Sequence, residues 1–207
     1  KVLRGMIPVN REELSVLVVG LGNREITPDA LGPRVADNMM ITRHVIREFG
    51  KYALGAEHSN LISSIVPGVM AQTGMESLEI IRGVIRETEP DCIVAVDALA
   101  ARSVKRLNRT IQITNTGINP GSGVGNHRHG LNRESVGIPV IAIGVPTVVD
   151  AATIVNDAIS GYYEEVDCTL NSFFVTPKDI DESIKRLSFT ISEGLNLAFE
   201  KTACTNS

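Results

Sequence analysis

The sequence predicts an α/β protein with a mainly parallel sheet that helices cover on both faces. Two observations lead to this fold class: short, continuous apolar runs rich in Val and Ile, and segments between them with apolar residues at helical spacing. Strands that alternate with helices imply right-handed crossovers between parallel strands. At 207 residues the chain has the size of one domain, so we expect residues 1–207 to form a single α/β domain.

The N-terminal half predicts two strands, each followed by a helix. Ser15–Leu21 (SVLVVGL) is a Val-rich run and is expected to be a strand buried on both faces. Pro33–Phe49 has apolar residues near helical spacing and is expected to be one helix. Leu61–Val66 is the second strand, closed by a Pro-Gly pair, and Thr73–Glu87 is a helix that opens with a T-x-x-E capping box.

The middle of the chain predicts three further strands. Asp91–Ala98 is a nearly unbroken apolar run, and Ile138–Val145 is another. Thr110–Thr114 alternates Ile with polar residues, which indicates an edge or half-exposed position. Residues Asn115–Gly130 between these strands are rich in Gly and are expected to form a loop.

Two helices complete the predicted fold. Ala151–Tyr163 is the first, and Thr176–Glu200 is a long final helix whose apolar residues recur at helical spacing. Residues 161–172 are polar and acidic without clear periodicity, so we expect a loop there.

Composition excludes several classes of function. A formal net charge of −4, 4% aromatic residues and no Trp argue against a nucleic-acid-binding surface. No apolar run approaches the ~20 residues that a membrane helix needs, and no signal peptide is visible, so we expect no membrane partner. Three Cys residues without a CxxC pair argue against a thiolate zinc site and fit a reducing, cytoplasmic compartment.

Two acidic residues stand where ligands bind in an open parallel sheet, beyond the carboxyl ends of the strands. Asp29 follows the first strand, and Asp97 closes the third. Two carboxylates at one edge would share a proton, which supplies a base for water and an acid for a leaving amine. Two alternatives stay open: Asp29 as a helix N-cap, and Asp97 as a carboxylate bonded to a loop amide.

Other motifs give weaker signals. The run NPGSGVGN (Asn119–Asn126) is not followed by Gly-Lys-Ser/Thr and so is not a Walker loop; a loop beside the site is the simpler interpretation. His127 and His129 could join the two aspartates as metal ligands, or they could belong to a solvated basic loop. No G-x-S-x-G motif is present to indicate a nucleophilic serine. We therefore expect no cofactor.

Several long motifs occur in an order that resembles the germination proteases of spore-forming bacteria, the GPR endopeptidases. The resemblance runs from about Ser15 to Asp157, and the segments FVTPKDIDESI and EGLNLAF are similar to the family's C-terminal helix. The motifs that carry it are GLGNREITPDALGP, SSIVPGVMAQTGMESLEIIRGVI, PDCIVAVDALAARSVKRLNRTIQITNTGINPGSGVGN and GIPVIAIGVPTVVDAATI.

The resemblance implies an atypical aspartic endopeptidase with a phosphorylase/hydrolase-like α/β fold, as in the hydrogenase maturation proteases. The family's catalytic aspartates fall on Asp29, in TPDALGP, and Asp97, in VDALA. The implied substrates are the small acid-soluble proteins of spores, in the cytoplasm of the forespore or spore core. Family members are zymogens and homotetramers. They are longer than this chain, and residues 161–172 mark where an insertion is missing.

Seven further residues are expected to bind substrate or line the site: Asn23, Thr73, Gly74, Asn119, Gly121, Gly123 and His127. Two other functions remain open. One is a metal-dependent relative of the maturation proteases, with Asp29, Asp97 and either His127 or His129 as ligands. The other is a shortened, non-catalytic family member. The basic residues after Asp97 could attract acidic side chains of a substrate or form a solvated face: Arg102, Lys105, Arg106 and Arg109.

Overall fold

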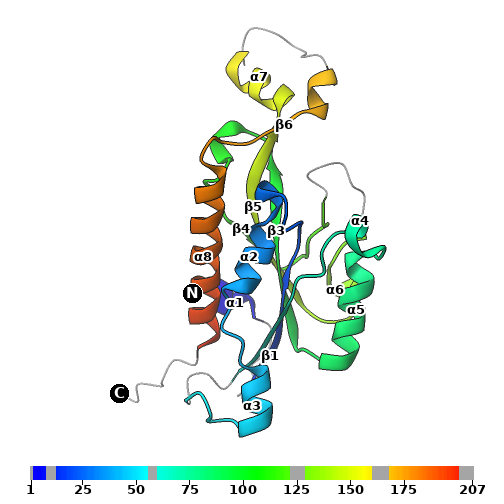
Figure 1. Ribbon diagram of the computed structural model, residues 1–207, viewed down its shortest axis with the longest axis vertical. Helices are drawn as coiled ribbons and strands as arrows, with labels where there is room; N and C mark the ends of the chain where they lie inside the picture. Colours follow the sequence, from blue (N-terminus) through cyan, green and yellow to red (C-terminus); the bar gives the residue numbers. More distant parts are fainter. Residues whose placement is uncertain (1, 8–12, 56–59, 122–128, 160–167, 201–207) are drawn as a thin grey trace.

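The computed structural model describes residues 2–7, 13–55, 60–121, 129–159 and 168–200. A central sheet has the strand order β2-β1-β3-β5-β4, and β6 pairs with the end of β5 (Figure 1). The pairs β1–β2, β1–β3 and β3–β5 are parallel, whereas β4 and β6 run antiparallel to β5. The strands are β1 (Ser15–Gly20), β2 (Leu61–Ile65), β3 (Cys92–Ala101), β4 (Gln112–Thr114), β5 (Val140–Asp150) and β6 (Phe174–Val175).

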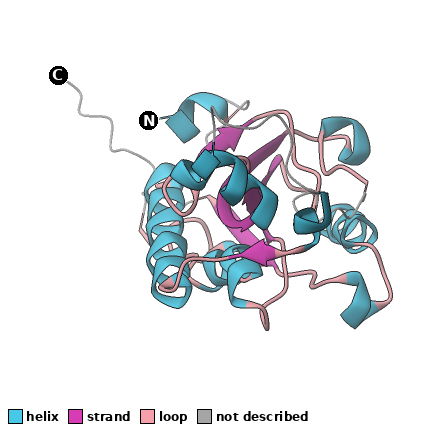
Figure 2. Ribbon diagram, turned by 90° about the horizontal axis from the view of Figure 1, so that it is seen from above, coloured by secondary structure: helices cyan, strands magenta, loops and turns pink. Residues whose placement is uncertain are grey.

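Helices cover both faces of this sheet, so the predicted fold class is confirmed (Figures 1 and 2). The long α8 and the short α2 pack on one face, and α5 packs on the other. The helices are α1 (Val2–Met6), α2 (Leu31–Asp37), α3 (Arg43–Phe49), α4 (Met70–Thr73), α5 (Ser77–Thr88), α6 (Arg133–Val136), α7 (Ala151–Ile159) and α8 (Ile180–Phe199). Short 3₁₀ helices are η1 (Thr27–Asp29), η3 (Val104–Arg106) and η5 (Cys168–Ser172).

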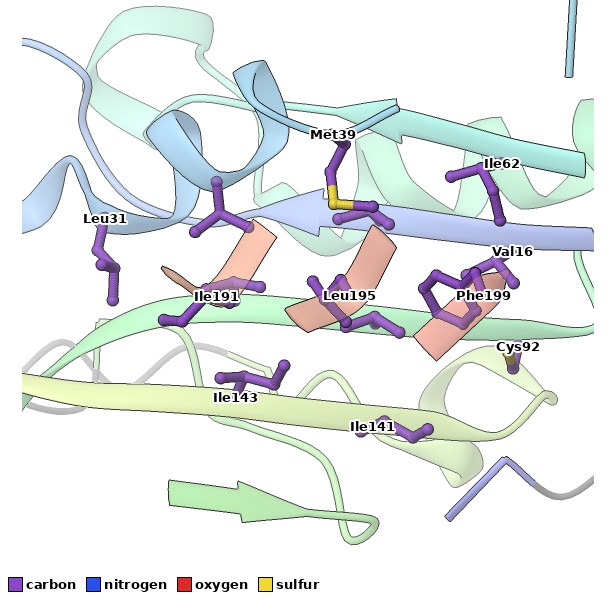
Figure 3. Packing of buried hydrophobic residues seen from close by; sticks show 14 of the residues in the cluster. Val16, Leu31, Met39, Ile62, Cys92, Ile141, Ile143, Ile191, Leu195 and Phe199 are labelled. Atoms are coloured by element: carbon purple, nitrogen blue, oxygen red, sulfur yellow. The ribbon is translucent and has the colours of Figure 1, made fainter. Parts of the chain in front are cut away.

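The alternation of side chains along the strands divides the core into two layers. Along β1, Val16 and Val18 face α2 and α8, whereas Leu17 and Val19 face α5. Figure 3 shows the first layer, with Leu195 of α8 and its neighbours packed over the strands. Because both faces are covered, β1, β3 and β5 read as continuous apolar runs, which is why sequence alone located them.

The helix predicted over Pro33–Phe49 is wrong as a single element. The structure has α2, which ends at Asp37, and α3, which begins at Arg43. In the link between them, Met39 is buried in the core and the Thr42 hydroxyl accepts a hydrogen bond from the Ile62 amide at 2.9 Å. Tertiary contacts therefore hold a non-helical link where the apolar spacing predicted a continuous helix.

The capping box predicted at Thr73 and Glu76 is also wrong. α4 ends at Thr73, and Gly74 follows in the left-handed conformation with φ of 72°, which terminates a helix. α5 begins three residues later, with Glu76 at its N-cap and the Glu79 carboxylate accepting from the Glu76 amide at 2.8 Å. The capping box exists, but one turn further along the chain.

Several boundaries at the carboxyl side of the sheet also differ. β3 runs on to Ala101, so Asp97 lies inside the strand instead of closing it. The final helix begins at Ile180, and the preceding Phe174–Val175 forms the unpredicted β6. β4 pairs on one side only, at the sheet edge, as its alternating sequence predicted.

Two predicted segments fall partly outside the described residues: the end of the helix expected over Ala151–Tyr163, and most of the loop expected over 161–172. Residues 168–172 of that loop form η5. Among the described helices, none combines the length and apolar character needed to cross a bilayer. That residues 1–207 form one domain stays a prediction.

Candidate active site

The loop after β1 folds back onto η1 and holds Asp29 in place. Gly22 has φ of 115°, and a Cβ atom there would lie 2.0 Å from the carbonyl oxygen of Asp29. Only glycine fits this approach. The neighbouring Asn23 amide donates a hydrogen bond to Asp29 Oδ2 at 2.6 Å. The carboxylate is therefore oriented by the loop and does not cap α2, whose N-cap residue is Ala30.

The start of α2 packs against the ends of two strands. A Cβ on Gly32 would lie 2.3 Å from the carbonyl oxygen of Leu21 and 2.4 Å from that of Val96. Asp29 precedes Gly32 by three residues, and Asp97 follows Val96 directly. The glycine contact therefore brings two acids from distant parts of the chain to the same edge of the sheet.

Both aspartates line one cleft with a volume of about 460 Å³. Asp97 is only 3% exposed, and its Oδ1 accepts a hydrogen bond from the Ala98 amide at 2.9 Å. Asp29 is half-buried. The remaining lining residues are Leu21, Gly22, Asn23, Ile26, Pro28, Val69, Ala71, Ser77, Ala98, Leu99, Ala100, Pro120, Gly121, Thr147, Val148, Phe174 and Thr176.

Asp29 and Asp97 are the only ionisable side chains among the described residues that line the cleft. Ser77 lines it too, but its hydroxyl donates to the carbonyl oxygen of Gly68 and no described histidine accompanies it. Cys92 lies in the core, where burial, reinforced by the charge of Asp91, raises the pKa of its thiol to about 12. Neither Ser77 nor Cys92 therefore has the surroundings that activate a nucleophile.

The predicted lining residues divide into three groups. Asn23 and Gly121 line the cleft. Thr73 and Gly74 are exposed at the end of α4, outside the lining. Asn119 is also absent from the lining, and its side chain lies beside Gly130. Gly123 and His127 lie outside the described residues.

His129 is not brought to the two aspartates. Its Nδ1 atom pairs with Glu76 Oε2 at 2.8 Å at the start of α5, and its side chain is largely exposed. Over the described ranges, no group of three His, Cys, Asp or Glu side chains is arranged to hold a metal ion. The basic cluster after Asp97 lies around η3, exposed and outside the cleft lining: Arg102, Lys105, Arg106 and Arg109.

Sequence reasoning missed the contributions of β5 and β6. Thr147 lines the cleft, is 1% exposed, and its Oγ1 has no hydrogen-bond partner among the described residues. Phe174 and Thr176 also line the cleft. The signal for Thr147 was weak, because a polar residue after Pro146 in an apolar run also reads as the end of a strand.

Two carboxylates thus lie in a largely apolar cleft at the carboxyl edge of an α/β sheet, which is where sheets of this class bind their ligands. The family model for the germination protease matches residues 6–166. The chain therefore belongs to the germination protease family of peptidases, and the resemblance found in the sequence is confirmed.

Two relatives illustrate the match. The chain is 44% identical to the germination protease of Caldanaerobacter subterraneus over 220 aligned positions, which cover 92% of this chain and 67% of that protein. It is 55% identical to the germination protease of Bacillus velezensis over 148 positions, or 72% of this chain and 40% of that protein. The first alignment is longer than this chain, so that relative has residues within the matched region that this chain lacks.

A solved structure shares the fold. The [NiFe] hydrogenase maturation protease HycI of Thermococcus kodakarensis matches with a TM-score of 0.52 at 18% identity, over 96% of this chain and 99% of HycI. At this identity the likeness shows the fold, as the sequence predicted.

Proposed function

We propose that this protein is an aspartic-type endopeptidase that starts the degradation of small acid-soluble spore proteins during germination. Membership of the germination protease family supports the peptidase activity and its place in germination. One observation carries the catalytic class: Asp29 and Asp97 line one cleft in which, among the described residues, no other side chain can take or give a proton near neutral pH.

The proposed reaction is the attack of a water molecule on the scissile carbonyl carbon. One aspartate, ionised, takes a proton from the water as the new C–O bond forms. The other, protonated, donates a hydrogen bond to the carbonyl oxygen and then passes its proton to the leaving nitrogen as the C–N bond breaks. Two acids that share a proton titrate as a pair, so the roles belong to the pair. The Asn23 and Ala98 amides hold the two carboxylates in place.

The cleft suits a polypeptide with apolar side chains at the cut. Ile26, Val69 and Leu99 line it, and Phe174 adds an aromatic ring. An unfolded substrate can enter such a cleft as an extended segment without first being unfolded by the enzyme. Small acid-soluble spore proteins, disordered when free of DNA, fit this requirement.

Three further properties are proposed from the family resemblance: assembly as a homotetramer, synthesis as a zymogen, and location in the cytoplasm of the forespore or spore core. The catalytic proposal needs no cofactor, because the two carboxyl groups supply both the base and the acid. Light scattering of the purified protein tests the tetramer.

The catalytic proposal is tested by incubating the protein with a small acid-soluble spore protein and mapping the fragments by mass spectrometry. Asp29→Asn and Asp97→Asn should each abolish cleavage, since each keeps the shape of the side chain but not its acid–base function. Glu25→Gln is the matched control, because Glu25 is an exposed carboxylate in the same loop that does not line the cleft. Full cleavage by either Asn variant, or its loss on chelation of metals, would contradict the proposal.

A further inference from the structure

One edge of β3 is open at the candidate active site. β1 pairs with β3 only as far as the pair Gly20–Val96, whereas β3 continues to Ala101. Beyond Val96, none of the strands in the described parts of the chain takes the place of β1 on that side. β3 thus extends past the end of its neighbour, with β5 still paired on its other side.

The hydrogen bonds of β3 show which of its residues face the open edge. The Ile93 amide donates toward β5, to the Pro139 carbonyl at 2.9 Å, and the Val96 carbonyl accepts from Leu21 on the β1 side at 2.8 Å. Because successive residues in a strand direct their backbone groups to opposite sides, Ala98 and Ala100 face the open edge. The Ala98 amide is bound to Asp97 Oδ1, which leaves the Ala98 carbonyl and both polar groups of Ala100 directed there.

The cleft reaches this edge of β3 and also extends to Thr147 and Val148 of β5. Four consecutive residues, Asp97–Ala100, line it. Neighbouring side chains of a strand point to opposite faces, so a cleft on one face would contact only every second residue. The lining also includes residues next to helices on both faces of the sheet: Ser77 begins α5 on one face, and Thr176 precedes α8 on the other. The cleft therefore includes the space beyond the end of β1, beside Ala98 and Ala100.

A second, independent observation points to a ligand in this cleft. In the β3–β5 register, Leu99 lies opposite Pro146 and Ala100 opposite Val148, so Thr147 is the extra residue of a β-bulge. Bulges redirect a side chain and are frequent beside active sites. Thr147 is 1% exposed and lines the cleft, and its buried hydroxyl lacks a hydrogen-bond partner among the described residues. A buried hydroxyl without a partner needs an explanation, and a polar group bound in the cleft would supply one.

We propose that the protein substrate binds as an added strand along Ala98–Ala101, in the position that β1 would occupy if it were longer. Backbone groups of alternate substrate residues pair with Ala98 and Ala100, and the scissile bond lies beside Asp97 and Asp29. This inference rests on the proposed function. Recognition through the backbone gives affinity without a demanding sequence, and the apolar walls add preference at alternate side chains.

The first test uses the unaltered protein. A synthetic peptide that spans one cleavage site, located by mass spectrometry, is N-methylated at one backbone amide at a time, and kcat/KM is measured for each. If the substrate binds as an added strand, kcat/KM should fall about tenfold when the methylated amide faces β3, which happens at every second residue. Methylation at the residues between them should change kcat/KM little. Losses at consecutive residues, or tolerance of every methyl group, would overturn the inference while cleavage itself upheld the function.

The second test removes the protein's own donor. Ala100→Pro deletes the amide that faces the open edge, where proline is tolerated, whereas Ala100→Ser keeps that amide with a similar side-chain size. We expect the KM of Ala100→Pro to exceed that of Ala100→Ser about tenfold, with little change in the thermal unfolding midpoint. Equal KM values for the two folded variants would contradict the inference; if the proline variant does not fold, the methylation series decides. Absence of cleavage of the unmodified peptide would remove the function and the inference together.

Discussion

Gly32 of α2 lies against the carbonyl oxygen of Val96 in β3 so closely that a Cβ atom on Gly32 would stand 2.4 Å away. Gly20 of β1 completes the contact, because a Cβ there would stand 2.3 Å from the Gly32 carbonyl oxygen. The helix thus rests on backbone with no side chain between. The separation between α2 and β3 sets how near Asp29, at the end of η1, comes to Asp97. The geometry of the site therefore depends on Gly32, which lies outside the cleft.

Gly32→Ala is therefore expected to lower both stability and activity. A Cβ in this space forces α2 away from the sheet, at a cost of about 1–3 kcal/mol for overpacking. A displacement of about 1 Å between the aspartates would lower kcat about 100-fold. Urea unfolding and peptide cleavage measure the two effects.

Gly194→Ala is the matched control, because Gly194 lies in α8 with no atom within 4 Å of the added Cβ. It should stabilise the protein by about 0.5–1 kcal/mol and leave kcat unchanged. If Gly32→Ala behaved like Gly194→Ala, the close contact would not be what positions Asp29.

Thr147→Val should separate stability from activity. Valine has the shape of threonine without the buried, unsatisfied hydroxyl, so the variant should be more stable by about 1–3 kcal/mol. If that hydroxyl binds the substrate, KM should rise about tenfold. Thr147→Ser keeps the hydroxyl and should keep a parental KM. A valine variant that is less stable and has the parental KM would show that the hydroxyl has a partner within the protein.

The sequence located the buried strands of this protein because covering both faces of a sheet leaves an unmistakable run of apolar residues. The positions of Asp29 and Asp97 followed from the rule on strand ends and from the family resemblance, and both now line one cleft. Local patterns failed where tertiary contacts decide. Met39 continues the apolar spacing that predicted a helix, yet the contacts of Met39 with the core and of Thr42 with β2 hold the chain out of a helix.

The rest of the site depends on register, which a single sequence does not contain. β3 extends beyond Asp97 because β5 continues beside it, and Thr147 enters the cleft because the two strands differ by one residue in length there. Phe174 reaches the cleft through β6, a two-residue strand with no periodicity to detect.

The corrected capping box at α5 gives a prediction of its own. Glu79→Ala removes the carboxylate that accepts from the Glu76 amide, and should lower the free energy of unfolding by about 0.5–2 kcal/mol. Thr73→Ala should cost less, because Thr73 lies at the exposed end of α4 and does not cap α5. Denaturant unfolding of both variants measures the difference. A larger loss for Thr73→Ala would favour the capping box first expected from the sequence.

Cys92 should make the protein lose stability in alkaline solution. Burial raises the pKa of its thiol from 9.0 to about 12, so between these pH values the unfolded chain releases a proton that the folded protein keeps. The thiol's contribution is fully present below pH 9.0 and falls as pH rises toward 12, by about 1.4 kcal/mol per pH unit. Urea unfolding measures the free energy of unfolding at about pH 8 and about pH 10.5. Between these pH values the parent should lose about 2 kcal/mol more of this free energy than Cys92→Ala, which has no thiol at that position to titrate. Other groups titrate equally in both proteins, so equal losses would mean that the Cys92 thiol already reaches water in the folded state.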